Sequence, residues 1–97
     1  MPSDFASVVR AELTDPILDL CRLFADEKAH DQFTFFSGIL NLLHDPDDEE
    51  MVLTACIELS KCAFLGYEYS LDAQLKIDAI LERAINLSHT MSASNLN

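Results

Sequence analysis

The chain of 97 residues contains little glycine, little proline and few basic side chains. Its two glycines stand alone, which excludes the glycine-rich loops that hold nucleotide phosphates. The chain has six Lys and Arg and 17 Asp and Glu, so its formal net charge is -11. Such a field repels nucleic-acid phosphates and anionic lipid and attracts basic protein surfaces or cations. We therefore expect no direct contact with nucleic acid and no contact with a membrane.

Cysteine is also sparse, and its pattern argues against a disulfide framework or a metal finger. Cys21, Cys56 and Cys62 are an odd number, lie among apolar residues and form no C-x-x-C pair. We expect them to be buried free thiols in a reducing compartment. The stretch MPSDFASVV lacks the basic and apolar regions of a signal peptide, and the apolar run 33–43 is too short to span a bilayer. The prediction is a soluble, cytoplasmic protein.

Apolar residues recur at spacings of three and four along most of the chain, which is typical of amphipathic helices. A hydrophobic content of 49% is sufficient for one core without disulfides or metals. The sequence therefore predicts an all-α fold: a compact bundle of four main helices plus a short N-terminal helix, joined by short loops. The bundle is expected to be up-and-down or orthogonal. Residues 1–90 are expected to form a single domain and residues 91–97 a flexible tail.

The first helix is expected to open at Pro2 and Ser3. Its inner face is predicted to carry Phe5, Val8, Val9 and Leu13. A second helix is expected to start anew at Asp15, the N-cap, with Pro16 in the first helical position, where its missing N–H is tolerated.

Segment 30–44 is the most apolar part of the chain, with apolar residues on two faces of a predicted helix. Such a helix is central in a bundle or shared with another chain. Its continuity with helix 16–28 stays open. Gly38 costs roughly 1 kcal/mol here relative to alanine, which close helix contact or a kink would explain. The candidate self-association residues are Phe33, Phe35, Phe36, Ile39 and Leu42.

A third long helix is expected from Pro46 to about Leu65, with Gly66 as a left-handed stop. A last helix is expected to follow Ser70, its N-cap. The inward residues predicted for these two helices are Val52, Ala55, Cys56, Leu59, Cys62 and Ala63, then Leu71, Ala73, Ile77, Ile80, Leu81, Ala84, Ile85 and Leu87.

The stretch HDPDDEE, residues 44–50, is the densest group of polar side chains in the chain. As a calcium loop it lacks the glycine and the glutamate at the required positions, and no Glu-x-x-His of a di-iron bundle occurs. Helix capping suits every residue: Asp45 would be the N-cap, and the acids after Pro46 would lie at the positive end of the helix dipole.

No basic residue occurs between Lys28 and Lys61, although seven acids lie in that interval. Two interpretations stay open: the charge keeps the protein dispersed, or a basic partner docks there. The aromatic corner FLGYEY, residues 64–69, either closes the end of the core or anchors a partner. The candidate partner-binding residues are Asp45, Asp47, Asp48, Glu49, Glu50, Tyr67 and Tyr69.

No serine or cysteine stands beside a histidine in a nucleophile signature. We therefore expect that the protein is not an enzyme and that it binds no cofactor and no metal. The leading hypothesis is a non-enzymatic interaction module, such as an inhibitor, an immunity-type protein or a regulatory adaptor, that binds a partner with a basic surface. The alternatives are a self-associating homodimeric module, a nucleic-acid mimic, and a metal- or ligand-binding bundle.

Overall fold

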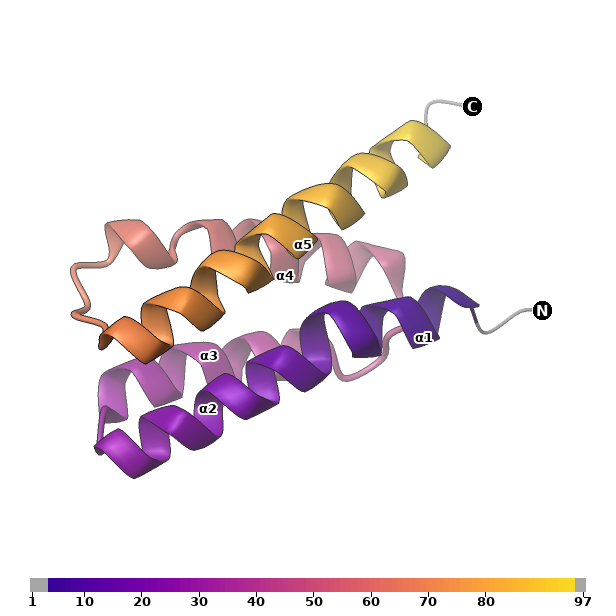
Figure 1. The fold of residues 1–97 in the computed structure, drawn as a ribbon. Helices are drawn as coiled ribbons and strands as arrows, with labels where there is room; N and C mark the ends of the chain where they lie inside the picture. Colours follow the sequence, from indigo (N-terminus) through magenta and orange to yellow (C-terminus); the bar gives the residue numbers. More distant parts are fainter. Residues whose placement is uncertain (1–3, 96–97) are drawn as a thin grey trace.

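A computed structural model describes residues 4–95, and this part of the chain is all-α (Figure 1). The elements are α1 (Asp4–Val9), a π-helical turn (Arg10–Thr14), α2 (Asp15–Glu27), α3 (His30–Leu42), α4 (Glu49–Ser60), a 3-10 turn (Cys62–Phe64) and α5 (Leu71–Asn95). Each of the four main helices contacts the next, and α5 returns to α2. The predicted all-α class and the four main helices are confirmed, and the arrangement is up-and-down.

The N-terminal helix does not restart at Asp15, so that part of the prediction was wrong. Asp15 has helical dihedrals, and its N–H donates to the carbonyl of Arg10, five residues back. Pro16 lacks an N–H, and its ring would crowd the carbonyl four residues earlier in a regular helix. The π-helical turn immediately before it widens the backbone and lets α1 and α2 continue as one helix. Pro2 and Ser3 lie outside the described residues.

A sharp turn at Lys28 separates α2 from α3, which answers the open question about their continuity. Lys28 has a positive φ of 59°. Its N–H donates to Ala25, and the N–H of Ala29 donates to Phe24 at 2.9 Å. These two bonds form a Schellman motif, which usually has glycine or asparagine at the left-handed position. Because a lysine occupies it here, the sequence contained no visible stop signal.

α3 packs against α2 on one side and α4 on the other, and since each of the four main helices has two such neighbours, α3 is no more central than the others. Phe36 and Ile39 are fully buried. Gly38 is exposed, α3 continues through it without a break, and a Cβ built there would meet nothing within 4 Å. Neither a close contact among the described residues nor an interruption of the helix explains this glycine.

α4 ends earlier than predicted, at Ser60, and the 3-10 turn carries the chain to Phe64. Gly66 has the positive φ, +79°, that a left-handed stop requires, but it does not end α4, whose C-cap is Lys61. Ala63 is exposed, since the tighter turn rotates it away from the core.

α5 begins with Ser70 as its N-cap, which confirms the prediction: the N–H of Ala73 donates to Ser70 Oγ at 3.2 Å. The same hydroxyl donates to Glu27 Oε2 at 2.6 Å and so joins the ends of α2 and α5. The helix continues past residue 90 to Asn95, and Met91 is buried. The helix thus extends past residue 90, the predicted end of the domain: Met91 lies four residues after Leu87 and extends the buried stripe. Residues 96–97 lie outside the described part of the chain.

The core follows the predicted stripes with a few exceptions. Val8, Leu71 and Ile85 are exposed although the helical pattern placed them inward. The three cysteines are free and buried, and burial raises the pKa of each thiol. They act as small apolar side chains, as expected.

Candidate partner-binding surface

The acidic stretch HDPDDEE forms the loop between α3 and the start of α4. The N–H of Asp48 donates to the carbonyl of Asp45 at 3.0 Å, and Asp45 Oδ1 accepts from the N–H of Asp47 at 3.1 Å. Asp45 and Pro46 therefore begin a β-turn, in which proline is favoured at the second position. Asp48 is the N-cap, because its Oδ1 accepts from the N–H of Met51 at 3.3 Å. The prediction that Asp45 caps the helix was wrong by three residues.

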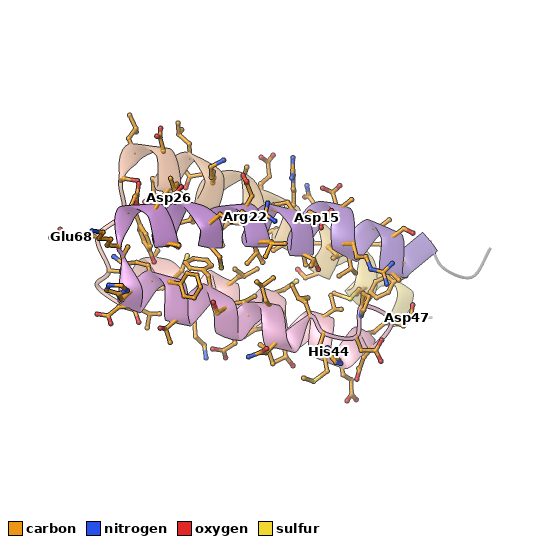
Figure 2. The ribbon with its side chains drawn as sticks, turned by 90° about the horizontal axis from the view of Figure 1, so that it is seen from below. Asp15, Arg22, Asp26, His44, Asp47 and Glu68 are labelled. Atoms are coloured by element: carbon orange, nitrogen blue, oxygen red, sulfur yellow. The ribbon has the colours of Figure 1, made fainter. Side chains whose placement is uncertain are left out.

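Three of the five acids have no role in this backbone geometry. Asp47, Glu49 and Glu50 are exposed, and Glu49 and Glu50 occupy the first turn of α4. Figure 2 shows Asp47 and His44 at the end of the bundle opposite Glu68. Capping and turn formation account for Asp45 and Asp48. The remaining three carboxylates are free to face a partner.

The two tyrosines of the aromatic corner have different surroundings. Tyr69 donates its hydroxyl to the carbonyl of Cys62 at 3.0 Å, and its ring lies 6.1 Å from the ring of Phe24. Burial raises the pKa of Tyr69 to about 12. Tyr69 thus closes one end of the core. Tyr67 is half-buried against Phe35. Phe64 was not among the candidate partner-binding residues. It is 86% exposed and is the largest free apolar side chain of the corner.

The five proposed self-association residues do not form one surface. Phe36 and Ile39 lie in the core and contact no second chain unless the bundle opens. Phe33 is 39% exposed, and Phe35 and Leu42 are half-buried. The two apolar faces of α3 pack against two neighbouring helices, α2 and α4, so they do not require a second chain.

The seam between the N-terminal helix and α5 carries ion pairs. Lys76 Nζ lies 2.9 Å from Asp19 Oδ2, and Arg83 Nε lies 3.3 Å from Glu12 Oε2. The hydrogen bond and charge of Lys76 lower the pKa of Asp19. Figure 2 shows the α2 residues Asp15, Arg22 and Asp26, an acid, a base and an acid, along this side of the bundle. We call this surface, which carries Glu12, Asp15, Asp19, Arg22, Asp26, Lys76 and Arg83, the paired face.

The opposite half, residues 30–60, comprises α3, the acidic loop and α4, and we call its surface the base-free face. It has seven acids and no Lys or Arg, a formal charge of -7. Lys61 lies just beyond it and pairs with Glu58 at 2.8 Å. The other six acids of this half form no ion pair among the described residues. The charge of this half is therefore largely uncompensated.

An open groove of about 460 Å³ lies between α3 and α4 on the base-free face. Gly38 lies in it, and we call it the Gly38 groove. It is lined by Thr34, Phe35, Gly38, Ile39, Leu42, Thr54 and Glu58. The hydroxyls of Thr34 and Thr54 donate to carbonyls of their own helices, at 3.0 and 2.9 Å. Apart from Glu58, the lining thus presents no polar side chain in need of a partner.

A second groove, of about 400 Å³, runs between α4 and α5. Ile57 and Ile85 line it and are 52% and 54% exposed. The sequence pattern placed Ile85 on the inward stripe of α5 and did not place Ile57 on that of α4, so it did not indicate that the two residues line one groove. Exposed apolar side chains at facing positions of two helices are a feature that only the packing reveals.

Among residues 4–95, no group of three or more His, Cys, Asp and Glu side chains is arranged to bind a metal ion. Within the same range, no helix combines the length and apolar character needed to cross a bilayer. Comparisons with known protein families, with curated proteins and with solved structures find no match to this chain.

Proposed function

We propose that this protein is a non-enzymatic interaction module whose base-free face binds a protein partner with a basic surface. The observation that carries this proposal is the division of charge: seven acids without a base on one half, and cross-helix ion pairs on the other. Uncompensated like charges do not stabilise a fold, but they attract a basic surface and accelerate its encounter. Net charge for dispersal alone would not require the bases to be absent from one half.

The test neutralises only acids that the backbone geometry does not need. The variant Asp47→Asn, Glu49→Gln, Glu50→Gln keeps Asp45 for the turn and Asp48 for the cap. A matched control, Asp15→Asn, Asp26→Asn, Glu82→Gln, removes the same charge from exposed positions outside the base-free face. The probe is an oligolysine peptide, and its affinity is measured by calorimetry at about 50 mM and about 150 mM salt.

We expect the first variant to bind about tenfold more weakly than the control variant at low salt, and the difference to shrink at the higher salt concentration. Equal weakening in both variants would show that only the total charge matters. It would then favour the dispersal interpretation over a binding face.

A second candidate function is self-association, which the exposed Ile57 and Ile85 at the α4–α5 groove favour. This surface differs from the α3 residues that the sequence indicated. Sedimentation equilibrium at high protein concentration tests it, with Ile85→Gln as the variant. A strictly monomeric wild-type chain would exclude it.

A further inference from the structure

Gly38 has no conformational or packing role within the described residues. Its φ is not positive, and a methyl group would fit there without touching anything within 4 Å. Glycine inside a helix is nevertheless costly, because its backbone loses more freedom on folding than that of alanine. One use of glycine that offsets this cost is close approach of another molecule to the backbone.

The lining of the Gly38 groove indicates what kind of group would approach. Phe35, Ile39 and Leu42 provide an apolar surface, and the two threonine hydroxyls are already bonded within their helices. Glu58 is the one charged side chain of the lining, so a polar group placed elsewhere over the floor would lose water and find only the hydroxyl oxygens of Thr34 and Thr54 as acceptors. Apolar side chains therefore suit the floor of the groove.

Acids lie around this apolar floor. Glu58 lines the groove itself, Asp31 lies one turn before Phe35, and Glu50 lies one turn before Thr54. Lys61 is the nearest base along α4, and Glu58 already binds it. A group that places apolar side chains over Gly38 would therefore have its flanks close to carboxylates.

The shape of the groove favours a helix over an extended strand. From Thr34 to Leu42 the groove follows nine residues of α3, a rise of about 12 Å, which corresponds to roughly two turns of a helix. The walls are helices whose backbone groups are bonded internally, so they offer no edge to a strand. A helix satisfies its own backbone and presents apolar residues at i, i+3, i+4 and i+7.

We propose that the Gly38 groove binds an amphipathic helix of the partner, with apolar side chains over Gly38 and Lys or Arg on both flanks. This inference rests on the proposed function and names the partner's chemistry. A second copy of this chain does not fit, because its net charge is also -11 and a face-to-face dimer would bring two base-free faces together. Like charges at such an interface oppose association.

The test uses a fluorescent peptide of about 18 residues, made of Leu and Lys with Leu at helical spacing, about five turns long. A peptide of the same composition, ordered so that no apolar face forms, is its control. Gly38→Ala and Gly38→Leu fill the groove stepwise. Both replacements favour helix, so loss of folding does not explain loss of binding. Ala25→Leu adds the same side chain at an exposed position of α2 and is the matched control.

We expect the amphipathic peptide to bind about tenfold more tightly than the reordered one. We also expect Gly38→Ala to weaken its binding by about fivefold and Gly38→Leu by more, with Ala25→Leu unchanged. If Gly38→Leu binds the peptide as tightly as wild type while the Asp47, Glu49, Glu50 variant binds it more weakly, the Gly38 groove is not the binding site. The proposed function would still stand. If neutralising those acids also had no effect, the proposed function would fail too. A wild-type dimer that Gly38→Leu dissociates would identify a second copy as the occupant and overturn the proposed partner chemistry.

Discussion

The paired face and the base-free face belong to one bundle and cover the same core, but they differ in whether their acidic side chains form ion pairs across the helices. On the paired face, Lys76 and Arg83 of α5 reach Asp19 and Glu12 of the N-terminal helix. On the base-free face, α3 and α4 pack together without any ion pair between them among the described residues. Both seams are closed by buried apolar residues. Ion pairing across a seam is therefore not what closes this bundle.

This contrast separates what folding needs from what it does not. The core, the Schellman turn at Lys28 and the caps at Asp48 and Ser70 are structural. The carboxylates of Asp47, Glu49 and Glu50 form no hydrogen bond or ion pair among the described residues, although Glu49 and Glu50 lie at the favourable end of the α4 dipole, and no described atom fills the space above Gly38. These two features lie on the same half of the molecule, which is why we propose that a partner binds there.

The largest expected effect concerns the core that both faces share. Phe36→Ala should lower the free energy of unfolding by about 3–5 kcal/mol, because it leaves a large cavity beside Phe24 and Tyr69, whose rings lie 5.5 and 6.5 Å from the ring of Phe36. Phe33→Ala, on the exposed side of α3, should cost less than about 1 kcal/mol. Urea denaturation measures both. A small loss for Phe36→Ala, accompanied by a change of oligomeric state, would place Phe36 at an interface instead.

The next effect concerns the turn between the two halves. Lys28→Gly should be more stable than Lys28→Ala by about 1 kcal/mol, because only glycine adopts the positive φ without steric cost. Both variants lose the same charge, so their difference in unfolding free energy isolates the backbone. Equal stability of the two variants would contradict the left-handed conformation.

A gain in stability of similar size is expected at Gly38. Gly38→Ala should raise the unfolding free energy by about 0.5–1 kcal/mol, since the methyl group meets no atom within 4 Å and alanine favours helix. Thermal or urea denaturation is sufficient to measure it. Destabilisation would show that the glycine has a packing role after all, and the groove would lose its main support.

The smallest effect belongs to the paired face. Lys76 lowers the pKa of Asp19 below its usual value of 3.8. This interaction therefore contributes stability above about pH 4, and the contribution is lost as the pH falls through the lowered pKa. In Lys76→Gln this acid-dependent part should disappear, and the effect in wild type should be small because both side chains are exposed. Urea denaturation between about pH 5 and pH 2 tests this. If the unfolding free energy of the variant depended on pH as that of wild type does, the ion pair would not contribute to stability.

Much of the fold could be predicted from apolar spacing, because burial of a stripe dominates helix packing: α4 carries its core where the pattern placed it, and α5 does so except at Leu71 and Ile85. Local backbone chemistry was harder. Lys28 takes a conformation that usually signals glycine, and the helix continues through Pro16 by a π-helical turn. Asp45 and Asp48 are both suitable capping residues, and only the β-turn at Pro46 decides between them.

The candidate site shows the same division. The absence of bases from residues 29–60 is visible in the sequence, and so is the cost of Gly38. That these two features share one face depends on how α3 and α4 pack, which places Thr54 and Glu58 opposite Gly38. The exposure of Ile85 also depends on tertiary packing, since it fits the inward pattern of α5.

The most direct test of the central claim compares the salt dependence of binding in two variants. The affinity of the oligolysine peptide is measured for the Asp47, Glu49, Glu50 variant and for the Asp15, Asp26, Glu82 control, both with a net charge reduced by the same amount. We predict that the control keeps the wild-type affinity and its fall with rising salt, whereas the first variant loses most of both. Identical affinities and identical salt dependence in the two variants would contradict a binding role for the base-free face.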